Sequence, residues 1–380
     1  MDAATLPKGP VAWDPSLGAW TVTGYELVKQ ALRDTERFTS ENGIMAANLG
    51  EEAMLADDSP VHDAVRAVWA RSFGVSGVMA RRAEIEQLAR ELLTPIFAAL
   101  RRGETVDIVP VLDAMAGRVV LGMLDFSQPR EEEFTRLCKI LLEASAFTIA
   151  ADHPLYRAKA EAKAQVYAFL EDELHNRLDR LAGGERPTDL IALIAQAQGR
   201  SGITRTVALS NLFNVFVGGG DTTVRWMGNA IVLLHQHPEA LAELRANPAL
   251  LPQALEEVMR IRSVTRFAIR AVKIDGVELA GQALPRGDTV YLMGSLANLD
   301  PAVFEDPERF DIHRKAKPHL GFSHGMHLCI GMNLARIEAQ VLLGQLLLAP
   351  DAPMLEIVEA DYGDESVVRG PERLLLRMAD

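Results

Sequence analysis

The sequence predicts a mostly helical protein with a small β portion, and three patterns support this. Apolar residues recur three and four positions apart over most of residues 61–260 and again over 330–348, which is the spacing of amphipathic helices. Residues 268–293 alternate instead, and the turn signals Asp275-Gly276 and Pro285-Arg286-Gly287 divide them into short strands. No internal repeat or low-complexity linker interrupts the chain, so we expect one domain over residues 1–380.

The elements follow in chain order. Residues 19–24 predict a short strand, and residues 25–33 predict an amphipathic helix. Helices are then expected over residues 61–100, 112–124, 131–150, 155–181, 188–197, 204–235, 238–247 and 252–260. The helix from Thr204 to His235 is among the longest, and Gly183-Gly184 ends the helix over 155–181. A proline-rich loop separates the strands from the last helix, and residues 354–378 alternate enough for a final hairpin.

Composition excludes several classes of protein. Of the 380 residues 48% are hydrophobic and 24% charged, as in a globular enzyme rather than a disordered chain. The net charge is 39 − 52 = −13, which argues against binding nucleic acid without sequence preference. Two distant cysteines indicate a reduced, cytoplasmic protein. The first fifteen residues do not resemble a signal peptide, and no run of eighteen apolar residues suggests a membrane span.

The segment around Cys329 is the most informative in the chain. Cys329 precedes a predicted helix that begins near Gly331, so its sulfur would lie at the positive end of that helix. Such a position favours a thiolate that is available to a metal. Gly325 and Gly331 would let the backbone pass close to a flat or bulky group.

Two other readings of this loop remain open from the residues alone. A single cysteine in a turn is more often structural than reactive. A zinc site is also conceivable, because several potential ligands cluster here: His313, His319, His324, His327 and Cys329. A His-x-Cys pair is poor spacing for one tetrahedral ion, and no Cys-x-x-Cys pair is present.

The pattern Phe322-x-x-Gly325-x-His327-x-Cys329-x-Gly331 resembles the haem-binding signature of the cytochrome P-450 family. The resemblance extends from about Trp20 to the end of the chain. It implies haem b as the cofactor, with Cys329 as the axial ligand of the iron. It also implies a single domain that holds the haem between the Thr204-to-His235 helix and the helix after Cys329.

A second motif, Phe216-Val-Gly-Gly-Gly-Asp221-Thr222-Thr223, lies within the long predicted helix. Three consecutive glycines cost about 1 kcal/mol each relative to alanine, so something is expected to approach this backbone closely. The Thr222 hydroxyl can also donate back to the carbonyl of Gly218. A kink or a close helix crossing is the plain interpretation. The resemblance implies instead that Asp221 and Thr222 are the oxygen-activating pair, with Gly218 where alanine is more common.

Charged residues on a later helix match a structural feature of the same family. Glu257 and Arg260 share one helix face, as do many solvated pairs such as Glu133 and Arg136. The resemblance implies a buried triad that holds the cysteine loop. Its third member would be Arg309, from Pro307-Glu308-Arg309-Phe310.

Four cationic or hydrogen-bonding residues match positions that hold the haem propionates in the family. His62 and Arg66 are spaced i, i+4 at the start of a predicted helix. Arg270 lies on the first predicted strand, and His327 lies two residues before the cysteine. Each alone would more often be a surface residue, but four donors around one dianionic group form a coherent site.

The resemblance implies a monooxygenase that acts as a monomer and takes electrons from a separate ferredoxin or flavodoxin. A basic surface on the cysteine side would attract such an acidic partner, and we expect it to include Arg71, Arg81, Arg82, Arg314, Lys315, Lys317 and Arg336. Scattered solvated charges are the alternative. A family member with peroxide-driven or other haem chemistry is a rival, as is a haem-binding sensor, and the Asp221–Thr222 pair argues against both.

The substrate is expected to be a hydrophobic small molecule. Three mostly apolar segments are predicted to line its site: residues 44–55, 213–217 and 264–269. The family pattern is broken here at Val264, where proline is usual, and by the basic residues Arg262 and Arg266. Arg266 could hold a carboxylate or point outward.

Overall fold

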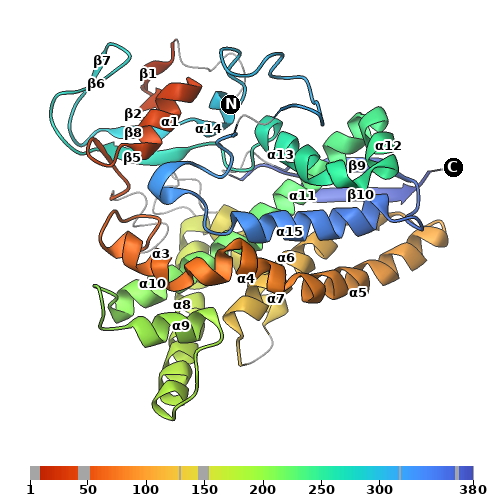
Figure 1. The fold of residues 1–380 in the computed structure, drawn as a ribbon, viewed down its shortest axis with the longest axis horizontal. Helices are drawn as coiled ribbons and strands as arrows, with labels where there is room; N and C mark the ends of the chain where they lie inside the picture. The colour runs from red at the N-terminus through yellow and green to blue at the C-terminus, as the bar shows by residue number, and fades with distance from the viewer. Residues whose placement is uncertain are drawn as a thin grey trace.

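Helices make up most of the molecule, and the strands gather in two places (Figure 1). The computed structural model describes residues 9–41, 52–127, 130–143, 154–315, 318–363 and 368–379. The α-helices are α1 Tyr25–Arg33, α3 Val61–Phe73, α4 Val75–Ala80, α5 Arg82–Arg101, α6 Val109–Leu124, α7 Glu131–Glu143, α8 Pro154–Ala182, α9 Leu190–Ala197, α10 Arg205–Gly220, α11 Thr222–Gln236, α12 Pro238–Ala246, α13 Leu251–Ile261, α14 Gly294–Ala297 and α15 Met332–Leu343.

The strands form three sheets. The largest has the order β1-β2-β8-β5-β3 and contains β1 Val11–Asp14, β2 Ala19–Val22, β3 Phe38–Thr39, β5 Ala268–Val272 and β8 Thr289–Leu292. A hairpin joins β6 Val277–Leu279 to β7 Gln282–Leu284. The third sheet has the order β4-β10-β9, with β4 Val106–Asp107, β9 Leu355–Asp361 and β10 Arg373–Met378. The mostly helical fold and the predicted final hairpin are therefore confirmed.

The long helix expected from Thr204 to His235 is two helices, α10 and α11, which separate at Asp221. Thr204 caps the first, since its hydroxyl accepts from the Val207 N–H at 3.1 Å. At the junction the Thr222 hydroxyl donates to the Gly218 carbonyl at 2.7 Å, as the sequence predicted. This bond competes for a helical acceptor directly after three poor helix formers, which explains the break.

The core follows α10 and α11, which pack against α6, α7, α8, α13 and α15. Two tryptophans are fully buried there. The Trp69 indole donates to the Leu190 carbonyl at 3.1 Å, and that of Trp226 donates to Leu255 at 3.3 Å. Figure 1 shows α15 running across the middle of the molecule, between the sheet of β1, β2, β5 and β8 and helices α3 to α5. The segment that precedes α15 carries Cys329.

Candidate functional site

The cysteine loop is fixed from both ends. The Cys329 N–H donates to the Phe322 carbonyl at 2.9 Å, and Arg66 Nη1 on α3 donates to the Leu328 carbonyl at 2.8 Å. Gly325 has a φ of +72°, and a Cβ there would lie 2.7 Å from the Leu32 carbonyl oxygen of α1. Glycine is therefore required at position 325 for the loop to pass this closely over α1.

The Cys329 thiol is free and exposed, whereas Cys138 is buried. Although Cys329 is accessible to solvent, the protein atoms packed around it desolvate its thiolate and raise the pKa of the thiol. The N–H groups of Gly331 and Met332 and the charges of Arg66 and Arg336 act in the opposite direction and lower it. An accessible thiol with such donors and cations around it can act as an anionic ligand once a metal replaces its proton.

Three donors converge beside this loop. The His62 and His327 rings lie edge to face with centroids 4.8 Å apart, and the charges of His62 and Arg270 both act on His327. Burial lowers the pKa of Arg270 to about 10 and also lowers the pKa of His327. Among the residues that the structure describes, His62 Nε2 and Arg270 Nη2 are buried without a hydrogen-bond partner. One buried carboxylate already lies here, since Asp58 Oδ1 is 3.5 Å from His327 Nε2 and its charge acts on Arg270. Buried donors left unpaired are costly, so the two orphaned atoms favour a further acceptor.

The residues present fit the propionate end of a haem. Two carboxylates would pair the orphaned atoms of His62 and Arg270, while His327 is already held by Ser40 Oγ at 2.9 Å from its Nε2. Arg66 differs from the other three, because its described bond goes to the loop carbonyl of Leu328. It thus ties α3 to the cysteine loop.

The three glycines of α10 serve two purposes. A Cβ on Gly219 would lie 2.4 Å from Val120 of α6, and one on Gly220 would lie 2.6 Å from the Cys138 sulfur of α7. A close helix crossing therefore accounts for these two. Gly218 is exposed, and a Cβ there would have no neighbour within 4 Å. It opens the same helix face on which the Thr222 hydroxyl lies.

Asp221 is buried, and its carboxylate is bound by Arg225, which the sequence analysis did not identify. Arg225 Nε lies 3.1 Å from both Asp221 oxygens, Nη1 donates to the Gly370 carbonyl at 3.0 Å, and Nη2 lies 3.5 Å from Glu372. One guanidinium therefore connects a buried acid to an exposed one. The i, i+4 spacing of Asp221 and Arg225 was a usable signal.

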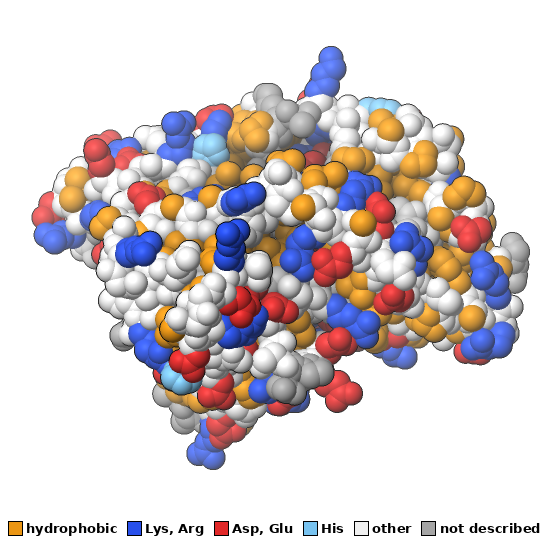
Figure 2. Space-filling model, turned by 60° about the horizontal axis from the view of Figure 1, so that its bottom comes forward, with side chains coloured by type: hydrophobic (Ala, Val, Ile, Leu, Met, Phe, Trp, Pro, Cys, Tyr) orange, Lys and Arg blue, Asp and Glu red, His pale blue; other side chains and the backbone are white. Residues whose placement is uncertain are grey.

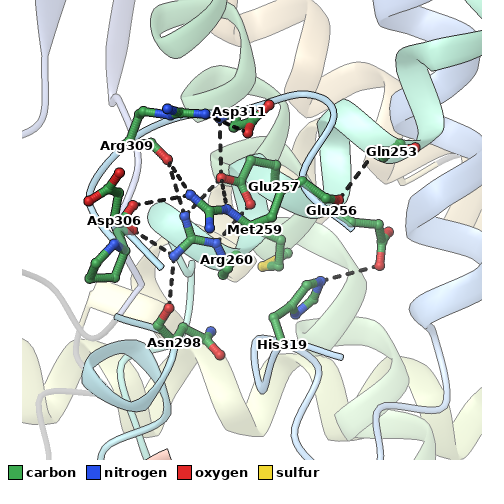
Figure 3. Close-up of polar contacts among 12 residues, drawn as sticks. Gln253, Glu256, Glu257, Met259, Arg260, Asn298, Asp306, Arg309, Asp311 and His319 are labelled. Carbon is green, nitrogen blue, oxygen red and sulfur yellow. Dashed lines mark hydrogen bonds and ion pairs between the residues drawn. The ribbon is translucent and has the colours of Figure 1, made fainter. Parts of the chain in front are cut away.

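The predicted triad needs a correction (Figure 3). Arg260 binds Glu257 through Nε at 2.7 Å and Nη2 at 2.8 Å, and both side chains are buried. The third member is Arg314, whose Nε lies 2.9 Å from Glu257 Oε1. The Arg309 side chain is 65% exposed and pairs with Asp311, so only its backbone carbonyl joins the network. Its position on the loop turns this side chain outward.

This finding also reduces the expected basic surface. The Arg314 side chain is largely buried, and Arg336 is bound by both carboxylate oxygens of Glu256. Arg81 and Arg82 pair with Glu84 and Glu86, and Lys317 lies outside the described residues. Arg71 and Lys315 remain as exposed cations of that set.

The zinc interpretation of the loop finds no geometric support. Within the ranges that the structure describes, no group of three or more His, Cys, Asp or Glu side chains could hold a metal ion. The histidines face different partners: His313 binds Glu243, His319 binds Glu256 and His327 binds Ser40.

The expected substrate-lining segments are only partly visible. Residues 44–51 lie outside the described ranges. Phe213, Phe216 and Val217 are buried on α10, and Val264 is buried. Arg262 does not point into this region, since it binds Tyr362 and Gln236 through bonds of 2.7 Å each.

Among the described helices, none has the length and apolar character needed to cross a bilayer.

Comparison with known proteins gives a consistent result. Residues 13–349 match the family model described as Cytochrome P450. The chain is 31% identical to 20-oxo-5-O-mycaminosyltylactone 23-monooxygenase of Streptomyces fradiae, over 91% of this chain and 80% of that protein. It is 27% identical to the biotin biosynthesis cytochrome P450 of Bacillus subtilis, over 86% and 82%. The structure of P450BioI in complex with a hexadec-9Z-enoic acid ligated acyl carrier protein superposes with a TM-score of 0.85, at 26% identity, over 97% of this chain and 95% of that one.

Proposed function

The chain belongs to the cytochrome P450 family of haem-thiolate monooxygenases, and on that premise we propose that Cys329 is the axial ligand of its haem iron. The haem supplies the chemistry that inserts one oxygen atom of dioxygen into an organic substrate and reduces the other to water. The exposed Cys329 thiol beside two orphaned buried donors, His62 Nε2 and Arg270 Nη2, is the observation that carries the proposal.

His62, Arg66, Arg270 and His327 hold the propionates in this proposal. Buried donors without partners support His62 and Arg270. His327 lies between them, and its Nε2 is bound by Ser40. Arg66 is placed to contribute its remaining donors while Nη1 holds the Leu328 carbonyl. Two carboxylates paired with these groups would replace unfavourable buried donors with charge-assisted hydrogen bonds.

Asp221 and Thr222 deliver protons. The Thr222 hydroxyl lies on the helix face that Gly218 leaves open and donates to the Gly218 carbonyl, which leaves its oxygen able to accept a proton from the acid. Asp221 is held by Arg225, which connects it to the exposed Glu372. Release of Asp221 from Arg225 would let its carboxyl group carry a proton from the exterior to Thr222 Oγ1, while the hydroxyl turns away from the Gly218 carbonyl and passes its own hydrogen on.

The substrate is a hydrophobic organic molecule, and the electrons come from a separate ferredoxin or flavodoxin. Buried Phe213 and Val217 on α10 and buried Val264 support an apolar site. The relatives named above act on a glycosylated lactone and bind an acyl chain on a carrier protein, so the family site accepts large apolar groups.

The test of the iron ligand is spectroscopic. The reduced protein with carbon monoxide should show the red-shifted Soret band of a thiolate-ligated haem. Cys329→His should move the band to the position seen in globins, while Cys138→Ala, the matched control, should leave it unchanged. A colourless protein, or a red-shifted band retained in Cys329→Ala, would refute the proposal.

A further inference from the structure

Glu256 of α13 holds both sides of the cysteine loop at once. Its Oε2 lies 3.2 Å from His319 Nε2, at the start of the loop (Figure 3). Its two oxygens also accept from Arg336 Nε at 2.8 Å and Arg336 Nη2 at 2.6 Å, on the helix after the loop. The bidentate geometry with arginine is the strong form of this interaction.

The histidine in this cluster has a defined hydrogen-bonding role. His319 Nδ1 accepts from the Gly321 N–H at 3.1 Å, so Nε2 is the nitrogen that carries hydrogen and donates to Glu256. Both ring nitrogens are therefore used within the cluster. The opposite charges of Glu256 and Arg336 balance each other there.

The cluster is packed directly against the support of Cys329. The Arg336 guanidinium lies 4.9 Å from the centroid of the Phe322 ring, and the His319 ring lies 5.7 Å from it. The Phe322 carbonyl accepts the Cys329 N–H. Arg336 and Cys329 also lie near enough for their charges to interact.

We propose that Glu256 is a positioning residue that neutralises Arg336 beside the thiolate and thereby sets the reduction potential of the haem iron. A ferrous site carries one negative charge more than a ferric site, so a nearby unpaired cation favours the ferrous form and an unpaired anion disfavours it. With the pair intact the two charges largely cancel. This inference rests on the proposed role of Cys329 as the ligand.

The experiment measures the ferric–ferrous midpoint potential of the holoenzyme by spectroelectrochemical titration. Glu256→Gln should shift the potential to more positive values, because Arg336 loses its counter-charge. Arg336→Gln should shift it to more negative values. The double variant, which is again neutral, should return close to the unmodified protein. Glu256→Asp retains the charge and should change the potential least.

The matched control is an exposed pair. Glu243 on α12 binds His313 at 2.8 Å, so Glu243→Gln should leave the potential unchanged. If the role of the cluster were only structural, the two single variants would shift the potential in the same direction and the double variant would shift it furthest. That pattern would overturn the inference, as would unchanged potentials in all variants.

The carbon monoxide spectrum separates this inference from the proposed function. If the unmodified protein lacks the red-shifted band, the role of Cys329 fails first. If that band is present in the variants and their potentials do not move with charge, only the role of Glu256 fails. Should Glu256→Gln not take up haem, Arg336→Gln compared with Arg336→Lys still tests the sign, and equal potentials in those two would refute the inference.

Discussion

Asp221 and Thr222 are adjacent in sequence, yet their side chains have separate partners. The Thr222 hydroxyl is bonded to the Gly218 carbonyl, and the Asp221 carboxylate is bound by Arg225. In the proposed function the acid exchanges protons with the exterior and the alcohol passes them on. Their substitution should therefore produce two different defects.

Thr222→Ala should still take up haem and bind substrate. It should consume reductant while releasing hydrogen peroxide in place of product, since the hydroxyl that passes the proton is gone. Thr222→Ser keeps the hydroxyl and should keep most of the coupling. The measurement is product and peroxide formed per reductant consumed. Unchanged coupling in Thr222→Ala would mean that protons arrive by another route.

Asp221→Asn should slow oxygen consumption itself, by a factor on the order of 10², because the amide cannot carry the proton. The solvent deuterium isotope effect on the rate of oxygen consumption should be larger in Asp221→Asn than in the unmodified protein. An Asp221→Asn enzyme with the unmodified rate would remove this acid from the reaction.

The corrected triad yields a comparison between two arginines of one loop. Arg314→Ala would leave the buried Glu257 with one partner fewer, which should cost about 3 kcal/mol or more of stability. Arg309→Ala removes only an exposed pair with Asp311 and should leave the stability close to that of the unmodified protein. Denaturant unfolding monitored together with haem content measures both. Equal losses for the two variants would contradict the assignment.

At the scale of elements, the crossing of α10 over α6 and α7 depends on glycine. Gly219→Ala would press its methyl group against Val120 and should destabilise the protein by about 1–3 kcal/mol. Gly218→Ala meets open space and should be neutral or gain up to about 1 kcal/mol from helix propensity. Denaturant midpoints of the two variants give the test, and a Gly218→Ala loss as large as that of Gly219→Ala would refute it.

The connection between α13 and α15 should depend on pH. Burial raises the pKa of Glu256, but hydrogen bonds from His319 and Arg336 outweigh it and lower that pKa from 4.5 to about 2. A depressed carboxyl pKa stabilises the fold fully above the unfolded value of 4.5 and loses this contribution as the pH falls toward about 2. The difference in unfolding free energy between the unmodified protein and Glu256→Gln should therefore be constant above that window and shrink within it. A difference in unfolding free energy that is the same at pH 4.5 as at a pH of about 2 would contradict this expectation.

At the scale of the whole molecule, the surface charges bear on how an electron donor would dock. The net charge is −13, and on the face shown in Figure 2 basic and acidic side chains are interspersed. Arg314 and Arg336, two expected contributors to a basic surface, are occupied by Glu257 and Glu256. Steering of an acidic electron donor would then depend on exposed cations such as Arg71 and Lys315.

The rate of the first electron transfer from an acidic ferredoxin should therefore fall as salt increases, because exposed charges are screened over about 10 Å at 0.1 M. Lys315→Glu and Arg71→Glu should each slow it without changing the Soret spectrum. Arg373→Glu, on the terminal sheet, serves as the control. A rate that ignores both salt and charge reversal would mean docking by apolar contact or elsewhere.

Sequence patterns located most elements and the motifs of the site, because periodicity and glycine placement act locally. They could not choose between Arg309 and Arg314, since the path of an irregular loop decides which side chain turns inward. The bond between Glu256 and Arg336 joins residues 80 positions apart and leaves no local pattern. The break at Asp221 was partly foreseeable, because the Thr222 bond to Gly218 and a kink were both expected, but a complete division into two helices was not.

The strand β10 pairs with an element that lies far earlier in the sequence. It pairs with β4, and Leu374 and Leu376 are fully buried. The segment just ahead of it packs on α11, where a Cβ on Gly228 would lie 2.6 Å from Pro371. During synthesis, β4 and α11 are therefore made well before the residues that pair with or cover them, and their apolar surface stays uncovered until β10 follows. Such long-range closure slows folding and makes the nascent chain dependent on protection from aggregation.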